Sequence, residues 1–184
     1  MSKLTMWNVI SLDGCFEGAK SWDLSWHQLI LGDEFERLAI DNILRSADRL
    51  LFGRVTYEGM AAYWQTAKGA VAEYMNSLPK IVFSRTLSSV DWANTRLVKD
   101  SAVAEVEKLK RDGEKNSFIF GSGNLCQFLI ERNLFDEYRL LVAPVILGTG
   151  KLLFPSGIQR ENLKLLEERR LSSGGIYLRY EPAR

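Results

Sequence analysis

The stretch 117–154, SFIFGSGNLCQFLIERNLFDEYRLLVAPVILGTGKLLF, decides how the rest of the chain is interpreted. A short apolar run at 118–120 leads into Gly121-Ser122-Gly123-Asn124, and an amphipathic segment begins at Leu125. This order predicts a strand, a glycine turn and a helix. Because glycine has no Cβ, such a turn leaves backbone N–H groups at a helix N-terminus accessible to an anion. We therefore expect 121–125 to hold the phosphates of a nucleotide cofactor.

Neither glycine turn in this stretch identifies the cofactor alone. The first turn departs from the dinucleotide-binding fingerprint, because Cys126 stands where its third glycine belongs. The second turn, Gly148-Thr149-Gly150-Lys151, departs from the phosphate-binding P-loop, because Leu152 stands where serine or threonine is needed. We expect 148–150 to form a wall of the fold or of the substrate side.

Working outward, apolar strand-like segments alternate with amphipathic helix-like segments. Strands are predicted at 4–11, 49–52, 80–83, 92–98, 117–120, 137–143, 163–170 and 176–181, and helices at 33–46, 56–64, 70–77, 102–112 and 125–132. The alternation predicts a mainly parallel sheet covered on both faces, and the last two strands predict an antiparallel hairpin at one edge. The fold class is a three-layer α/β sandwich in one domain, residues 1–184.

Composition narrows the function classes. Hydrophobic residues make up 46% of the 184, and the net charge is +1, which favours neither a nucleic-acid partner nor a membrane partner. No apolar run reaches the length of a membrane span, and the first residues do not resemble a signal peptide, so we expect a cytoplasmic protein. Cys15 and Cys126 are expected to be free thiols. With one histidine, His27, and no CxxC, no metal site is expected.

Similar chemistry follows three predicted strands. The turns are Gly53-Arg54-x-Thr56, Ser84-Arg85-Thr86 and Gly121-Ser122-Gly123-Asn124. Ligands of open α/β sheets bind beyond the carboxyl ends of the strands, so these turns can meet on one ligand. The first and third turns offer N–H groups, hydroxyls and a cation for a pyrophosphate. Ser84 and Arg85 offer a hydroxyl and a guanidinium for a ribose phosphate.

These motifs together resemble a known family. The set consists of Ser11-Leu12-Asp13-Gly14, Gly53-Arg54-x-Thr56-Tyr57-Glu58, Ser84-Arg85-Thr86, Gly121-Ser122-Gly123 and Pro144-Val145-Ile146-Leu147-Gly148-x-Gly150. In this order and spacing the chain resembles the dihydrofolate reductase-like superfamily, and within it the RibD C-terminal reductase branch. The resemblance extends from residue 4 to about residue 180.

The resemblance implies NADPH bound across the strand ends. Gly53, Arg54 and Thr56 would contact the pyrophosphate and adenosine side, and Ser84 and Arg85 the 2′-phosphate. The pyrophosphate would also meet Gly121, Ser122, Gly123, Asn124 and Leu125. Main chain around Val9 and Phe16 would hold the nicotinamide amide. The family often has two adjacent glycines where Ser122 stands, and we expect the Ser122 backbone to avoid positive φ while presenting its N–H.

The implied reaction is hydride transfer to a C=N or C=O group of a small heterocycle, either an aminopyrimidine of the riboflavin pathway or a pterin-like ring. The candidate proton donors are Asp13, Asp33 and Glu34. Asp33 is equally suited to cap the first helix, and Asp13 to cap a turn. Trp22 and Trp26 are candidates for stacking on the substrate. His27 is a candidate for the proton-donating acid or for a substrate ligand, and is otherwise a solvated loop residue.

Two other classes of function fit the same sequence. One is a non-catalytic NADP(H)-binding module, possibly a homodimer, and the other is a structural fold without a ligand. The apolar segment 137–143 suggests an edge strand, which either pairs with a second copy in a homodimer or is an edge covered by other parts of the protein. The usual proline-tryptophan loop of folate reductases is absent before the first helix, where Trp22-Asp23-Leu24-Ser25-Trp26 stands. No additional phosphate site for a ribitol phosphate is evident.

Overall fold

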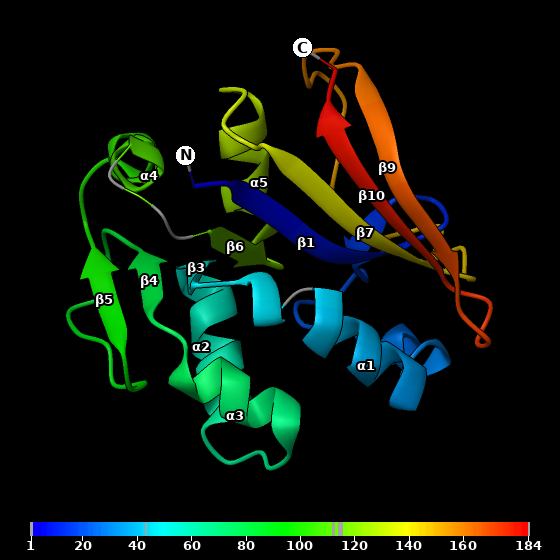
Figure 1. The fold of residues 1–184 in the computed structure, drawn as a ribbon, viewed down its shortest axis with the longest axis horizontal. Helices are drawn as coiled ribbons and strands as arrows, with labels where there is room; N and C mark the ends of the chain where they lie inside the picture. The colour runs from blue at the N-terminus through cyan, green and yellow to red at the C-terminus, as the bar shows by residue number, and fades with distance from the viewer. Residues whose placement is uncertain (1, 43, 112, 114–115, 184) are drawn as a thin grey trace.

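The computed structural model describes residues 2–42, 44–111, 113 and 116–183. In this part of the chain, one eight-stranded sheet runs through the molecule in the order β5-β4-β3-β6-β1-β7-β10-β9 (Figure 1). The strands are β1 Leu4–Ser11, β3 Arg49–Gly53, β4 Lys80–Phe83, β5 Thr95–Val98, β6 Ser117–Phe120, β7 Glu137–Ala143, β9 Leu163–Arg170 and β10 Ile176–Pro182. In this spatial order, each pair of neighbouring strands from β5 through β4, β3, β6 and β1 to β7 is parallel. Strand β10 is antiparallel to both β7 and β9. The predicted sheet and its terminal hairpin are therefore confirmed.

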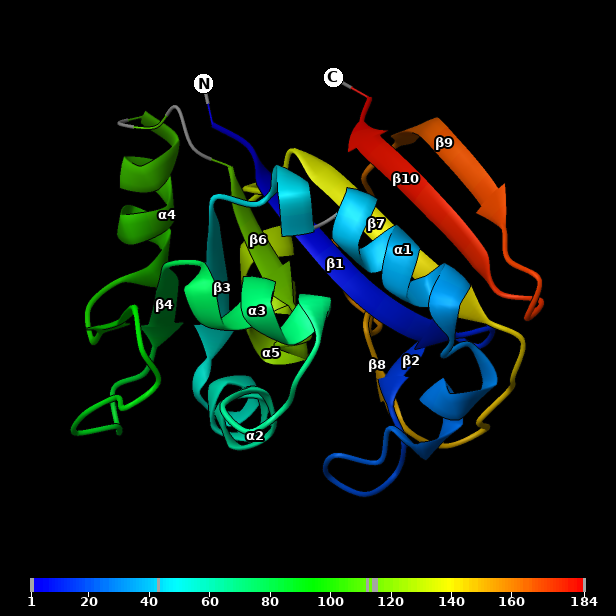
Figure 2. The same ribbon diagram turned by 60° about the horizontal axis from the view of Figure 1, so that its bottom comes forward.

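Helices cover both faces of the sheet. Figure 1 shows α1, α2 and α3 on one side of the sheet and α4 and α5 on the other, and Figure 2 brings the first group forward. Their bounds are α1 Asp33–Asn42, α2 Arg54–Trp64, α3 Ala70–Ser77, α4 Ala102–Arg111 and α5 Gly123–Ile130. Side chains alternate along β1, so that Trp7 and Val9 face one core and Met6 and Ile10 the other. This confirms the three-layer sandwich.

Several helix boundaries differ from the sequence prediction by a few residues, among them the start of α2 at Arg54 and the end of α5 at Ile130. The helix expected at 33–46 ends at Asn42 and is followed by the 3₁₀ turn η2, Leu44–Ser46; Ile43 lies outside the described residues. The residue expected to end the fourth helix, Asp112, lies outside them as well. Helix α5 begins at Gly123 and buries Cys126, Leu129 and Ile130. Phe128 is exposed, because the helical period places it on the opposite face.

The interpretation of 137–143 as an edge strand was wrong. Strand β7 lies inside the sheet, paired with β1 on one side and β10 on the other. Its apolar sequence follows from this burial between neighbours. The outermost strands are β5 and β9. The argument for a homodimer through 137–143 therefore no longer applies.

A small second sheet lies beside the carboxyl end of β1 and was not predicted. It pairs β2, Cys15–Glu17, with β8, Lys151–Leu152, in antiparallel order, so that Glu17 lies opposite Lys151 (Figure 2). The segment 12–32, expected as a turn and a long loop, also contains the 3₁₀ helix η1, Ser25–Leu29. Among the described helices, none is both long enough and apolar enough to cross a bilayer.

Candidate functional site

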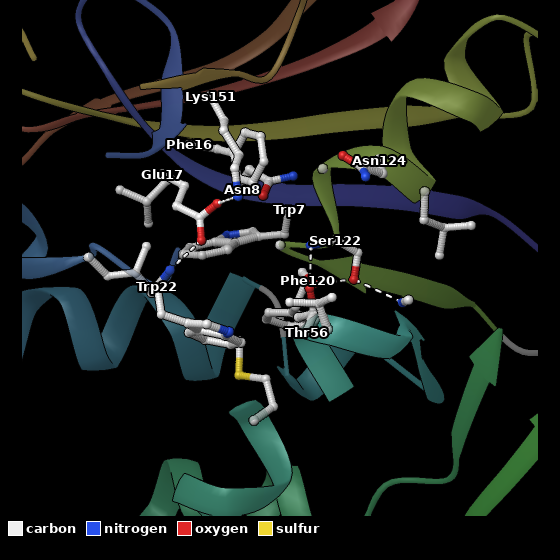
Figure 3. Close-up of a pocket in the computed structure, with 18 of the residues that line it drawn as sticks. Trp7, Asn8, Phe16, Glu17, Trp22, Thr56, Phe120, Ser122, Asn124 and Lys151 are labelled. Atoms are coloured by element: carbon white, nitrogen blue, oxygen red, sulfur yellow. Dashed lines mark hydrogen bonds and ion pairs between the residues drawn. The ribbon is translucent and has the colours of Figure 1, made fainter. Parts of the chain in front are cut away.

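A pocket of about 290 Å³ opens where strands β3 and β6 end and helices α2 and α5 begin. The turns after the two strands form one side of it, and β1 forms its floor with Trp7, Asn8 and Val9. The small sheet of β2 and β8 supplies part of the opposite side (Figure 3). The lining residues from the two turns are Gly53, Arg54, Val55, Thr56, Gly121, Ser122, Gly123, Asn124 and Leu125. The carboxyl ends of parallel strands thus meet at one concave site, as is usual for α/β ligand sites.

The first turns of two helices line this pocket. Helix α2 begins after Gly53 and α5 begins after Ser122, and neither end has a side-chain cap among the described residues. The first N–H groups of an α-helix have no partner within the helix, and the aligned peptide dipoles add partial positive charge there. Two uncapped N-termini at one pocket therefore provide a binding site for a doubly anionic group such as a pyrophosphate.

Ser122 joins the two turns instead of presenting its N–H to a ligand. Its backbone N–H donates to Oγ1 of Thr56 at 3.0 Å, and its Oγ accepts from the N–H of Gly53 at 3.1 Å. The expectation that its backbone avoids positive φ was wrong, since its φ is +53°. These hydrogen bonds offset the strain of the left-handed conformation. Ser122 and Thr56 thus fix the distance between the two helix N-termini.

Glycine is required at 121 and 123 for different reasons. Gly121 has a φ of +56°, which glycine adopts without strain. A Cβ at Gly123 would lie only 2.2 Å from Cζ of Phe16, so the phenyl ring packs directly on the start of α5. The sequence prediction used the main chain of Phe16, and the structure shows that its ring also forms part of the pocket wall.

Aromatic side chains form the walls of the pocket. The rings of Trp7 and Phe120 lie 5.7 Å apart at an interplanar angle of 32°. Trp22 lies across the pocket from Trp7 in Figure 3, and its ring covers Gly59 of α2, where a Cβ would be 2.0 Å away. Flat apolar walls of this kind bind planar rings.

Of the predicted substrate residues, Trp22 and His27 line the pocket and Trp26 does not. Trp26 is buried in the core, where its Nε1 donates to the carbonyl of Asp23. It is buried because η1 turns its ring toward the α1 side of the sheet, where it joins the core that contains Leu38. The prediction that Trp26 stacks on the substrate is therefore not supported by its position.

His27 is not a solvated loop residue. Its imidazole packs edge-on against Trp26, with centroids 4.4 Å apart. Burial lowers its pKa from 6.5 to about 4, so the ring is neutral near pH 7. Its Nε2 is buried and has no hydrogen-bond partner among the described residues, and the same holds for Nε1 of Trp7. Both ring nitrogens are therefore covered by protein atoms and lack a hydrogen bond among the described residues.

The three carboxylates predicted as proton donors all lie outside the pocket lining. Asp13 accepts hydrogen bonds from Ser11 Oγ and from the N–H groups of Leu147 and Gly148, and these bonds lower its pKa to about 2. Asp33 is the exposed first residue of α1.

Glu34 is likewise tied to another part of the fold. It accepts from both the Oγ and the N–H of Ser172 in the β9–β10 turn, at 2.6 and 2.7 Å, and these hydrogen bonds lower its pKa. The structure therefore places Asp13 and Glu34 as connectors between loops, the first at the 147–148 turn and the second at the terminal hairpin. None of the three candidates is among the residues that line the pocket.

The carboxylate that does line the pocket is Glu17, which sequence reasoning missed. Its residue is only 8% exposed. One oxygen accepts the backbone N–H of Trp22 and the other pairs with the ammonium of Lys151, which also lines the pocket (Figure 3). Glu17 and Lys151 are 134 residues apart and meet through strands of three and two residues. Such short strands leave no recognisable pattern in the sequence.

Ser84 and Arg85 lie beside the pocket but not in its lining. They follow β4, which pairs with β3 so that Phe83 lies opposite Gly53. The Oγ of Ser84 accepts from the N–H groups of Thr86 and Leu87. Arg85 is exposed at the same edge of the sheet as the two helix N-termini.

The residues present fit a pyridine dinucleotide. The two uncapped helix N-termini suit its pyrophosphate, and the aromatic walls suit a planar nicotinamide ring. Arg85 is exposed two residues after Phe83, which pairs with Gly53 at the start of α2.

Comparison with known proteins agrees with this geometry. The family model named RibD C-terminal domain matches residues 2–177. The uncharacterized protein YyaP of Bacillus subtilis (strain 168) is 32% identical over 177 residues, which cover 94% of this chain and 90% of YyaP.

Solved structures share the fold at lower sequence identity. A protein of Shewanella sp. PV-4 superposes with a TM-score of 0.83 at 20% identity, over 99% of both chains. RibD of Acinetobacter baumannii gives 0.71 at 16% identity, over all of this chain and 59% of RibD. A pyrimidine reductase-like protein of Corynebacterium diphtheriae gives 0.69 at 13% identity, over 100% of this chain and 92% of that one.

Proposed function

This chain belongs to the RibD C-terminal domain family, a family of NAD(P)H-dependent reductases, and from that premise we propose that it is an NADPH-dependent reductase of a small heterocyclic substrate. The observation that carries the proposal is the pair of uncapped helix N-termini, α2 and α5, opening on one aromatic-walled pocket. The pocket has room for a planar substrate ring beside a nicotinamide. The substrate class is an aminopyrimidine-like or pterin-like ring.

Each part of the pocket has a task in this reaction. Bound NADPH supplies a hydride for a C=N or C=O group. The N–H groups at the start of α2 and α5 bind the pyrophosphate, and the link between Ser122 and Thr56 holds the two helix ends in register. Trp7 and Trp22 orient the planar rings and exclude water from them.

Two structural relatives support the substrate class by their names. One is a RibD and the other is called pyrimidine reductase-like, and both share this fold. Their identity to this chain is below 20%, so the substrate assignment here rests on the shape and chemistry of the pocket.

Cofactor choice provides the test. We propose that Ser84 and Arg85 bind the 2′-phosphate that distinguishes NADPH from NADH. Because a guanidinium–phosphate contact at an exposed site contributes about 1–2 kcal/mol, Arg85→Ala should weaken NADPH binding about five- to thirtyfold and leave NADH binding unchanged. Calorimetric titration of both cofactors measures this. Arg132→Ala, which removes an exposed arginine stacked on Phe128 at the end of α5, is the matched control.

Two outcomes would contradict the assignments. Equal loss of affinity for NADPH and NADH in Arg85→Ala would refute the 2′-phosphate site. If neither cofactor at millimolar concentration raises the melting temperature of the native protein, the reductase proposal fails and a structural role without a ligand is favoured.

A second candidate function is a non-catalytic NADP(H)-binding module. The observation that favours it is that Asp13, Asp33 and Glu34 all lie outside the pocket. The two functions differ in turnover. If NADPH binds but a panel of pyrimidines, pterins and quinones leaves its absorbance at 340 nm unchanged, the binding module is the better description.

A further inference from the structure

The pocket contains a buried carboxylate to which the reductase proposal assigns no task. Glu17 lies on β2, beside the floor formed by Trp7 and Asn8, and its carboxylate faces the space between Trp7 and Trp22 in Figure 3. A carboxylate that is 8% exposed is energetically expensive unless it is paired. Its position at a ligand pocket therefore calls for a functional explanation in addition to its ion pair.

The hydrogen bonds of Glu17 leave room for a ligand. An ionised carboxylate offers about four acceptor positions on its two oxygens. The described partners are two, the N–H of Trp22 on Oε1 and the ammonium of Lys151 on Oε2. These two partners fix the orientation of the carboxylate, and each oxygen retains an acceptor position. A rigid carboxylate with spare acceptors binds N–H donors.

The two fixed partners also determine what kind of group fits beside it. Trp22 contributes both its N–H to Glu17 and its ring to the pocket wall, so a planar ligand against this ring has its edge near the carboxylate. The edge of a ligand that would match this carboxylate carries adjacent N–H donors, as does a ring with amino groups.

We propose that Glu17 is a substrate-binding residue that recognises the amino and ring N–H groups of a planar heterocycle carrying no phosphate or other anionic substituent near that edge. The proposal rests on the proposed function, because it assigns the substrate half of the same pocket. Lys151 acts as a positioning residue that holds the carboxylate in place through its ion pair.

Charge disfavours an anionic group in direct contact with Glu17. The charged residues that line the described pocket are Glu17, Lys151 and Arg54. Lys151 is paired with Glu17, and Arg54 pairs with Glu58 at 3.0 Å beside the opposite, cofactor side. A phosphate that replaced an N–H donor on Glu17 would meet its negative charge directly, which opposes binding.

The test uses binding of two ring probes of the same shape, in the absence of NADPH. The probe 2,4-diaminopyrimidine carries N–H donors, and 2,4-dimethylpyrimidine replaces them with methyl groups. In calorimetric titrations, Glu17→Gln should weaken the diamino probe about ten- to hundredfold, the range for a charge-assisted hydrogen bond, and leave the dimethyl probe unchanged. Equal binding of the diamino probe to variant and native protein, or equal loss of both probes, would overturn the proposal.

The matched control is Glu105→Gln. Glu105 is also largely buried and is paired with one cation, Arg96. The side chain of Glu105 is 15% exposed and that of Arg96 is 54% exposed. The corresponding values are 11% for Glu17 and 51% for Lys151. Glu105 lies on α4 and its ion pair with Arg96 links α4 to β5, outside the pocket lining. Both probes should bind this variant as they bind the native protein, and loss of the diamino probe here would overturn the assignment to Glu17.

A measurement on the native protein needs no variant. Pyrimidine-4-carboxylate, an anionic ring of similar size, should bind at least about tenfold more weakly than 2,4-diaminopyrimidine, because its charge meets that of Glu17. Equal affinities would overturn the proposal. NADPH takes no part in these titrations, so a failure of the Glu17 assignment is distinct from a failure of NADPH to raise the melting temperature.

Discussion

The neutral, buried His27 leads to a quantitative prediction for the pH dependence of stability. Its pKa falls from 6.5 in a solvated chain to about 4 in the folded protein, because burial disfavours the charged imidazolium. The group is a base whose folded pKa is lowered. Its contribution to stability is therefore complete above pH 6.5 and is lost as the pH falls toward 4, since the unfolded chain then binds a proton that the folded protein does not.

The magnitude follows from these two values. Between pH 7.5 and pH 5.0, the unfolded chain gains nearly a full proton at this site, while the folded protein gains about a tenth of one. Proton linkage converts this difference into about 2 kcal/mol of lost unfolding free energy. Carboxylates of the protein also titrate near pH 5, but they contribute equally to any variant that changes only His27.

The comparison is between the native protein and His27→Gln, which keeps a polar side chain of similar size. Urea unfolding at pH 7.5 and pH 5.0 gives the loss of unfolding free energy for each protein. The loss should be about 2 kcal/mol larger for the native protein.

Because the chain has a single histidine, its imidazole C–H resonance gives a direct second measurement by NMR. A folded-state midpoint near 6.5, or an equal loss of stability in both proteins, would refute the buried neutral imidazole.

Two further variants test the packing around the site and the sheet. Gly123→Ala should lower the unfolding free energy by about 1–3 kcal/mol and weaken NADPH binding, because the new Cβ would lie 2.2 Å from the ring of Phe16. Gly53→Ala is the control, because the atom nearest to its Cβ is 3.8 Å away. In thermal melts the control should keep the stability of the native protein. Glu137→Gln should lower the unfolding free energy by about 3 kcal/mol, which is roughly 6–12 °C in melting temperature. The reason is that the guanidinium groups of Arg139 and Arg179 lose their buried carboxylate. A fall in melting temperature of less than about 2 °C would contradict this.

The sheet could be predicted from the sequence because each of its strands is a continuous apolar or alternating segment. Burial on both faces selects such segments, and the helices between them follow the 3.6-residue period. The segment 137–143 shows the limit of this reasoning. Its composition is the same for an interior strand and for an apolar edge, and only the pairing with β1 and β10 decides between them.

The phosphate side of the site was also accessible from sequence, because it is local. Each turn is a few residues between a strand and a helix, and parallel pairing brings the strand ends together. The conformation of Ser122 was not accessible. It adopts a positive φ because its hydrogen bonds with Thr56 and Gly53, nearly seventy residues away, hold it there.

The substrate side could not be predicted, because it depends on contacts between distant short segments. Glu17 becomes a pocket carboxylate only when β2 pairs with β8, and the sequence separation hides that pairing. The more conspicuous acids at the start of α1 were favoured for their place in the chain. In the fold, Glu34 instead binds Ser172 at the terminal hairpin.

The phosphate side and the substrate side of the pocket should respond differently to substitution. Backbone N–H groups at helix N-termini bind phosphate through the geometry of the main chain, so the pyrophosphate side depends on backbone conformation and on the glycines that permit it. The substrate side is made of side chains, Glu17 and Trp22 among them, and their replacement changes which ring is recognised without altering the phosphate site. We therefore expect substitutions at Glu17 to change the substrate while NADPH affinity stays the same, and substitutions at Gly123 to do the reverse.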